Sequence, residues 1–332
     1  MIERTSYIFS PGVNPYENLA VEEYLLTHCG DDQCILYLWQ NQHTVVIGRN
    51  QNAWKECRVE KLKDEGGHLV RRLSGGGAVY HDLGNLNFTF LVRKENYDLT
   101  KQLDVILKAV RDLGIPAEKS GRNDLLAEGR KFSGNAFYER GGSCYHHGTL
   151  MVDVDLMKLN RYLSVSEEKL ASKGVASVPS RVVNLTDFVP GLTIEEVEKA
   201  LIDAFHQVYK VSPTPLKIQD LDEEKLAENT RKMSSWDWIY GRKLDFQYEM
   251  EHRFDWGMLQ LQFALSEGCV RDVAVYTDAL YAKPLETLSK VLTGCRFEKS
   301  ELAGQLRTFA SQYAEGKAML NDVADWFMER DW

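Results

Sequence analysis

The sequence has no apolar run of about 18 residues, no C-x-x-C pair among its 6 cysteines, and no excess of basic residues. No transmembrane helix is therefore expected, and Glu3 and Arg4 near the start do not fit a signal peptide. Scattered cysteines predict neither a disulfide framework nor a zinc site. We expect a cytoplasmic protein with free thiols and no membrane partner.

The charge balance is acidic, because 40 Lys and Arg stand against 49 Asp and Glu, for a formal net charge of −9. A protein that coats nucleic acid needs a basic surface to neutralise phosphates, so nucleic acid is not expected as a partner. The content of 44% hydrophobic and 27% charged residues is typical of an ordinary globular protein. A length of 332 residues predicts two domains.

Hydrophobic periodicity and capping residues predict three helices before residue 210. Asn14 can cap a helix that starts at Pro15. Apolar residues repeat at helical spacing through residues 98–113. Thr193 and Glu196 have the spacing of a capping box, which predicts the start of another helix.

Short β-favouring runs lie between these helices. Residues 34–39 and 44–49 stand on either side of a polar tetrapeptide, a pattern that predicts a hairpin. Residues 86–92 are a further strand candidate. Helices and strands therefore interleave through this part of the chain.

The chain changes in character between residues 212 and 235, where prolines and a charged run precede a patch of aromatic residues. Beyond it, residues 258–265 and 269–276 alternate as strands do. Helical segments are predicted at 284–292, 301–312 and 322–328. We expect a first domain at 1–244 and a small α+β domain at 245–332.

Residues 71–85, RRLSGGGAVYHDLGN, contain three consecutive glycines that neither a helix nor a strand explains. A glycine-rich turn can direct several N–H groups at one anionic oxygen, and Arg71 and Arg72 can add charge-assisted hydrogen bonds. The segment matches neither the Walker A pattern nor G-x-G-x-x-G. An anion-binding loop is the functional interpretation, and a tight turn between strands is the alternative.

Residues 120–138 are dense in polar side chains, with Asn123 and Asp124 before a strand and Lys131 after a turn. A lysine in such a place can direct its charge at a phosphate or a developing oxyanion. Asp124 can orient that ammonium or hold a divalent cation. A solvated hairpin with an ordinary surface lysine explains the same pattern equally well.

Two adjacent histidines, His146 and His147, lie on a predicted strand. Neighbouring side chains on a strand point to opposite faces, so one histidine can face a ligand while the other does not. For the same reason the pair alone makes a poor zinc site.

Residues 173–185, KGVASVPSRVVNL, are predicted to form a long loop with Lys173 and Arg181 near its ends. Loops of this kind often close over substrates. A plain surface connection is the alternative.

Together with residues 39–57, WQNQHTVVIGRNQNAWKEC, these four segments resemble the lipoate-protein ligase A family. The resemblance covers essentially the whole chain, and five motifs in the right order make it specific. It implies an α/β (α+β) fold: a catalytic domain of the biotin and lipoate ligase type, with central mixed β-sheets flanked by helices, and a small α+β accessory domain.

The resemblance also implies a two-step reaction. Lipoate and ATP, with Mg²⁺, would give lipoyl-AMP and pyrophosphate. The acyl group would then pass to a lysine on the lipoyl domain of a 2-oxoacid dehydrogenase E2 subunit or on the glycine cleavage H protein. Octanoate is expected as an alternative substrate, and the protein is expected to be a monomer.

Residue roles follow from the same resemblance. Lys131 would be the main catalytic group, with Asp124 as its partner or as a magnesium ligand. The residues implied around lipoate are Trp39, Arg71, Ser74, Gly75, Gly76, His81 and His147. Those implied for ATP and the adenylate are Arg71, Gly76, Gly77, Ala78, Val79, Tyr80, Asn123, Asp124, Lys131, Thr149, Lys173, Ser180 and Arg181.

Three other functions remain open at this point. An octanoyl or lipoyl transferase would need a reactive cysteine, and Cys144 with His146 as an activating partner is the candidate nearest the implied site. A biotin ligase is less favoured, because the glycine-rich segment follows the lipoate pattern. A module that binds lipoate or lipoyl domains without catalysis is the third.

Overall fold

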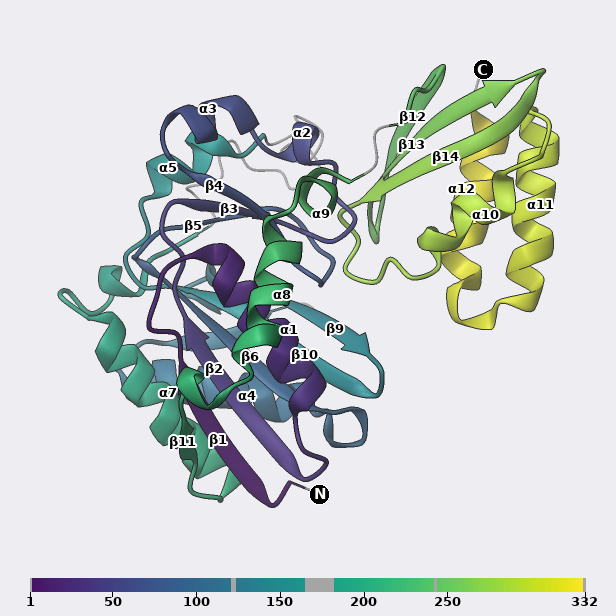
Figure 1. Cartoon of the computed structure of the whole chain (residues 1–332). Coiled ribbons are helices and arrows are strands. Elements are labelled where there is room, and N and C mark those ends of the chain that lie inside the picture. The colour runs from purple at the N-terminus through teal and green to yellow at the C-terminus, as the bar shows by residue number, and fades with distance from the viewer. Residues whose placement is uncertain (1, 121–123, 165–181, 242–243, 331–332) are drawn as a thin grey trace. The chain divides into compact units, whose positions relative to one another are not determined.

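The computed structural model describes residues 2–120, 124–164, 182–241 and 244–330 (Figure 1). The chain divides into two compact units. The first unit comprises residues 1–47, 53–74 and 78–239, and the second comprises 48–52, 75–77 and 240–332. The expected division into domains at 1–244 and 245–332 stays a prediction.

The first unit is built on an eight-stranded mixed sheet with the strand order β11-β1-β2-β6-β10-β9-β8-β7. Strand β1 pairs in parallel with β2 and β11, and the other neighbours pair antiparallel. The strands are β1 (Arg4–Phe9), β2 (Gln33–Trp39), β6 (Asn85–Arg93), β7 (Ala117–Ser120), β8 (Asp124–Ala127), β9 (Arg130–Arg140), β10 (Ser143–Met151) and β11 (Thr214–Leu216).

A second, three-stranded sheet consists of β3 (Thr44–Ile47) between β4 (His68–Arg71) and β5 (Val79–His81). The predicted hairpin of residues 34–39 and 44–49 is therefore wrong, because β2 and β3 belong to different sheets. Both strands are almost fully buried and each needs a partner on either side. Between them, His43 has a φ of 44°, a conformation that is typical of a sharp change in chain direction.

The helices start where capping residues predict them. Asn14 accepts a hydrogen bond from the Tyr16 N–H, and Thr193 and Glu196 form the capping box. The helices of the first unit are α1 (Pro15–His28), α2 (Ala53–Glu56), α3 (Val59–Asp64), α4 (Leu99–Asp112), α5 (Leu156–Tyr162), α7 (Ile194–Tyr209), α8 (Glu223–Ser234) and α9 (Trp236–Tyr240). Short 3₁₀ turns are η1 (Lys94–Asn96), η3 (Leu185–Asp187) and η4 (Ile218–Asp220).

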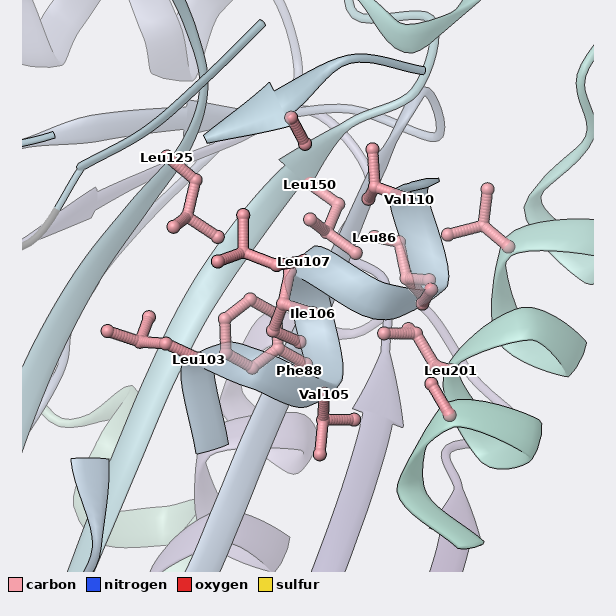
Figure 2. Close-up of a cluster of buried hydrophobic side chains, with 14 of the residues drawn as sticks. Leu86, Phe88, Leu103, Val105, Ile106, Leu107, Val110, Leu125, Leu150 and Leu201 are labelled. Atoms are coloured by element: carbon pink, nitrogen blue, oxygen red, sulfur yellow. The ribbon is translucent and has the colours of Figure 1, made fainter. Parts of the chain in front are cut away.

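The large sheet buries a different core on each face, because side chains along a strand alternate. Figure 2 shows one face, where Phe88 of β6 and Leu150 of β10 meet Ile106 and Leu107 of α4, with Leu201 of α7 nearby. The opposite face carries the intervening residues of the same strands and is covered by α1. The candidate site described below lies on that α1 face.

The second unit holds the antiparallel sheet β12-β13-β14, with β12 (Tyr248–Phe254), β13 (Gly257–Ser266) and β14 (Cys269–Thr277). Its other elements are η5 (Leu285–Thr287), α10 (Leu288–Leu292), α11 (Lys299–Gln312), η6 (Ala314–Gly316) and α12 (Lys317–Glu329). The two predicted strands and three helical segments are confirmed, whereas β12 had not been predicted. Across the described residues of both units, no helix is long and apolar enough to cross a membrane.

His146 allows the contribution of burial to stability to be tested on the sheet face that packs against α4 and α7. Its ring is fully buried against Phe88, Phe90 and Phe137, and its Nε2 lies 2.8 Å from the Asn135 Oδ1. Burial lowers the pKa of His146 to about 3. The histidine therefore binds a proton more readily in the unfolded chain than in the folded one. The contribution of the neutral His146 to the free energy of unfolding is present in full above about pH 6.5 and is lost as the pH falls toward 3.

We expect His146→Gln to flatten the pH dependence of stability, because glutamine keeps a hydrogen bond to Asn135 and does not titrate. Urea denaturation at about pH 7 and about pH 5 measures the difference. His206→Gln, at an exposed position of α7, is the matched control and should behave as the wild type does. Equal pH slopes for wild type and His146→Gln would contradict the assignment.

Candidate functional site

Lys131 and Asp124 form an ion pair where β8 turns into β9. The turn between the strands is made by Glu128 and Gly129, which have φ values of 48° and 75°. The Lys131 Nζ lies 2.6 Å from the Asp124 Oδ1, and the two side chains are 35% and 37% exposed. An oriented ammonium that is open to solvent can therefore reach a bound ligand.

The register of β8 and β9 shifts next to this pair. Asp124 is opposite Gly134 and Leu125 is opposite Ser133, but Leu126 is opposite Lys131, so Phe132 is the extra residue of a bulge. Bulges of this kind often redirect a side chain beside an active site.

Gly134 leaves room for the lysine. A Cβ atom on Gly134 would lie 3.1 Å from the Lys131 Cε and Nζ, and 3.9 Å from the Thr149 Oγ1. The Gly134 N–H donates to that hydroxyl at 3.2 Å. Lys131, Asp124 and Thr149, three predicted site residues, therefore meet around Gly134, which had not been predicted as a site residue.

Several predicted residues lie outside the described part of the chain: Asn123, Lys173, Ser180 and Arg181. The first described residues after that gap, Val182 and Val183, lie beside Lys131. Val182 bridges to Lys131, and the Val183 N–H donates to the Lys131 carbonyl at 2.9 Å. The main chain at the lysine is therefore held on both edges of β9.

Ser74 and His147 are joined to a buried carboxylate on α1. The Ser74 Oγ lies 2.8 Å from the His147 Nε2, and the His147 Nδ1 lies 2.8 Å from the Glu22 Oε1. The Arg72 Nε donates to the Ser74 Oγ at 3.0 Å. All four side chains are buried. Burial lowers the pKa of Arg72 to about 10, a value at which the guanidinium is still charged at neutral pH.

Trp39 reaches the same carboxylate through Thr89. The Trp39 Nε1–H donates to the Thr89 Oγ1 at 3.1 Å, and the Thr89 hydroxyl donates to the Glu22 Oε1 at 2.8 Å. The predicted residues Trp39, Ser74 and His147 are thus brought together by two residues that had not been predicted.

His81 is buried next to this group. Its Nδ1 lies 3.2 Å from the Asn41 Nδ2, and its ring stands edge-on to Trp39 at 6.3 Å. Burial, together with the positive charge of Arg72, lowers the pKa of His81 to about 3. The imidazole is therefore neutral at physiological pH and can accept or donate a hydrogen bond. Tyr80, predicted beside the adenine, is also buried.

Arg71 has a different environment from the one expected. Its Nε donates to the carbonyl oxygens of Trp238 and Ile239 at 3.0 Å each, and its Nη2 donates to the Ile239 carbonyl at 2.6 Å. The Trp238 Nε1–H donates back to the Arg71 carbonyl at 2.8 Å. Arg71 therefore holds the last turn of α9, and its predicted contact with lipoate and ATP stays a prediction.

The glycine-rich loop is divided between the units. Residues 75–77 belong to the second unit, in which the Gly76 N–H donates to the Ala279 carbonyl at 3.2 Å. Gly76 has a φ of 88°, and a Cβ on Gly48 would lie 2.1 Å from the Gly76 carbonyl oxygen. The positive φ of Gly76 and the close backbone approach at Gly48 explain why these two positions are glycine. Ala78 and Val79 follow in the first unit, at the start of β5.

Of the two residues that had not been predicted, Glu22 and Thr89, only Glu22 stands out in the sequence. Glu22 and its neighbour Glu23 stand between apolar residues of α1, in NLAVEEYLL, where charged side chains are unexpected on a buried face. Thr89 has no such signal, because threonine is common in strands.

Within the described residues, no group of three or more His, Cys, Asp or Glu side chains could hold a metal.

A surface cavity of about 430 Å³ lies elsewhere in the first unit. Asp112, Leu113, Lys199 and Asp203 are among its lining residues, and none of the predicted site residues lines it. The candidate site therefore rests on hydrogen-bond geometry and not on this cavity.

Two family models match the chain. Residues 14–206 match the lipoyl protein ligase A/B catalytic domain, and residues 243–327 match the bacterial lipoate protein ligase C-terminus. A protein of Bdellovibrio bacteriovorus named lipoate-protein ligase A is 38% identical over 98% of both chains. One of Psychrobacter cryohalolentis with the same name is 36% identical over 95% of both chains.

Solved structures show the same fold. LipL1 of P. falciparum in complex with lipoate has a TM-score of 0.84 and 27% identity, covering 98% of this chain and all of that one. A bipartite lipoate protein ligase of Thermoplasma acidophilum, described with its E2 lipoyl domain, has a TM-score of 0.63, 32% identity and coverages of 74% and 99%. A lipoate-protein ligase A bound with ATP has a TM-score of 0.61, 30% identity and coverages of 73% and 99%. The expected fold class is confirmed.

We expect Arg71→Met to destabilise the first unit by about 2 kcal/mol, because buried carbonyls at the end of α9 lose a charged donor. Urea denaturation measures the loss, and hydrogen exchange at residues 236–240 should rise. Arg231→Met, at an exposed arginine of α8, is the control and should change neither. Unchanged exchange in Arg71→Met would contradict the holding role.

Proposed function

The chain belongs to the lipoate-protein ligase A family, and from that premise we propose the two-step route by which it acts. Family membership makes it an enzyme that joins lipoate to proteins. In the first proposed step a lipoate carboxylate oxygen bonds to the α-phosphorus of ATP and pyrophosphate leaves. In the second, a protein lysine amine bonds to the acyl carbon, loses a proton and expels AMP.

Lys131 is proposed as the residue that makes the first step possible. A carboxylate and a triphosphate repel one another, so a positive charge has to lie between them in the transition state. The observation that carries this role is the ion pair with Asp124, which orients the Lys131 ammonium at a solvent-accessible point of β9. In the second step the same ammonium would stabilise the oxyanion that forms at the acyl carbon.

Mg²⁺ is proposed to accompany ATP. Proteins usually hold this ion with one or two carboxylates and leave its other positions to phosphates and water. Asp124 fits this pattern as a single, partly exposed carboxylate beside Lys131. The ion would reduce the negative charge of the phosphates. Thr149, which meets Lys131 at Gly134, is proposed as an ATP contact from the same side.

Trp39, Ser74, His81 and His147 are proposed to bind lipoate. This proposal is supported by the hydrogen bonds and ring contacts that bring the four side chains together on the α1 face of the large sheet. An apolar slot discriminates chain length only weakly, at about 0.8 kcal/mol per methylene. Octanoate is therefore proposed as an alternative substrate.

Lipoyl domains of E2 subunits and the glycine cleavage H protein are proposed as acceptors. The Thermoplasma acidophilum ligase, described with its E2 lipoyl domain, supports the first of these. Mixing the protein with both acceptors and following the mass of each tests the acceptor assignment.

We further propose a monomeric, cytoplasmic enzyme with a domain boundary at 244/245.

The transferase alternative depends on Cys144, and its environment argues against a reactive thiol. The side chain is buried, and burial raises the pKa of Cys144 to about 11. Cys144 is also five residues along β10 from Thr149, which is about 16 Å in a strand and places it on the opposite face. Cys144→Ala should leave ligation intact.

Release of pyrophosphate decides between an enzyme and a module that only binds lipoate. Lys131→Ala is expected to lower the rate of lipoate-dependent pyrophosphate release on the order of 100- to 1,000-fold while the fold survives. Lys119→Ala, at an exposed lysine of β7, is the matched control and should retain full activity. Near-normal turnover of Lys131→Ala would remove Lys131 from the mechanism, and a wild type without pyrophosphate release would refute the proposed chemistry.

Gly134→Ala tests the position of the ammonium. The new Cβ would lie 3.1 Å from the Lys131 Nζ, and the flexible end of the lysine can move away, so we expect an intact fold. Displacement of the charge should lower ligation about 10- to 100-fold. Gly12→Ala, where nothing lies within 4 Å of the new Cβ, is the control. A Gly134→Ala enzyme with wild-type kinetics would show that this spacing does not matter.

A further inference from the structure

Two runs of hydrogen bonds converge on one buried oxygen, the Glu22 Oε1. One runs from Trp39 through Thr89, with distances of 3.1 and 2.8 Å. The other runs from Arg72 through Ser74 and His147, with distances of 3.0, 2.8 and 2.8 Å. Glu22 is 1% exposed.

The chemistry of the donors sets the direction of each hydrogen bond. An ionised carboxylate can only accept, so the His147 Nδ1 has to carry the proton. In a neutral imidazole the Nε2 is then an acceptor, and the Ser74 hydroxyl donates to it. The Ser74 oxygen in turn accepts from Arg72, because a guanidinium can only donate. Every proton in the network therefore points toward Glu22.

Glu22 also balances charge inside the fold. Arg72 is 6% exposed, and a buried cation is costly unless an anion is near. The adjacent carboxylate, Glu23, does not serve this purpose, because it pairs with Lys232 at 2.6 Å and with Arg140 at 2.9 Å. The two neighbouring glutamates of α1 thus have separate partners.

We propose that Glu22 is a positioning residue of the lipoate site. It holds His147 in the Nδ1–H tautomer, turns the Ser74 hydroxyl toward His147, and fixes the Trp39 indole through Thr89. The inference rests on the proposed function, in which Trp39, Ser74 and His147 touch lipoate and Glu22 acts through them. Removing its acceptor oxygen would leave all three side chains free to reorient, which weakens substrate binding more than turnover.

Kinetics of two variants test the proposal. Glu22→Ala should raise the KM for lipoate about 10- to 100-fold, the range expected for losing hydrogen bonds to a charged group, with kcat within about 3-fold. Glu22→Gln should lie much closer to the wild type, because an amide oxygen can replace Oε1 as the shared acceptor. Glu23→Ala is the matched control from the next position of α1 and should keep the wild-type KM.

A double variant distinguishes a positioning role from a general loss of stability. If Glu22 acts in part through His147 and Ser74, Glu22→Ala should have a smaller effect on KM in a Ser74→Ala background than in the wild type, while the part that acts through Thr89 and Trp39 remains. Additive effects, an unchanged KM in Glu22→Ala, or equal damage in Glu22→Ala and Glu22→Gln would each overturn the proposal.

The tautomer can be read directly in the wild-type protein, whether or not Glu22→Ala folds. Nitrogen-15 NMR of histidine-labelled protein, assigned with His147→Gln, should show the proton of His147 at Nδ1 and none at Nε2. A ring protonated at Nε2, alone or together with Nδ1, would overturn the network. Wild-type pyrophosphate release is measured first: its absence would refute the proposed function and leave the NMR result to decide the network separately.

Discussion

The alternation of side chains along β10 is the constraint on which both the core and the candidate site depend. Cys144, His146 and Leu150 enter the face covered by α4 and α7, while Tyr145 and His147 enter the face covered by α1. A shift of one residue in register would exchange the two sets. The nine consecutive residue pairs with β6 hold that register, so the same hydrogen bonds that build the sheet separate structural from functional groups.

Charge inside the first unit is handled in two ways. Where a group must stay ionised, it has a partner: Lys131 has Asp124 at the surface, and Arg72 is linked to Glu22 through Ser74 and His147. His81 lies beside the neutral Asn41, and burial together with the positive charge of Arg72 lowers its pKa, so the imidazole stays neutral. The Lys131 ammonium on β9 is therefore accessible to a ligand, whereas the charges of Arg72 and Glu22 under α1 are held by their hydrogen-bond partners.

Close packing requires a glycine at two positions, one in each unit. Gly134 leaves space for the Lys131 side chain along its own strand, and Gly48 allows the carbonyl of Gly76 to approach its backbone. Neither position is explained by a turn alone. The three consecutive glycines are recognisable as an unusual pattern in the sequence, but Gly134 is not. The Lys131 side chain lies close to Gly134 only because of the bulge at Phe132, which the sequence does not reveal.

The sequence by itself determined the local features: the caps at Asn14 and Thr193, most strands and helices, the motif residues Lys131 and Asp124, and the separation of His146 from His147. These depend on neighbours within a few residues, which periodicity and capping chemistry record. Only the tertiary structure decided that β2 and β3 lie in different sheets, that Arg71 holds α9, and that Glu22 organises Trp39, Ser74 and His147. Each of these depends on hydrogen bonds between segments far apart in the chain, and no local pattern encodes which distant carbonyl or carboxylate will meet a given donor.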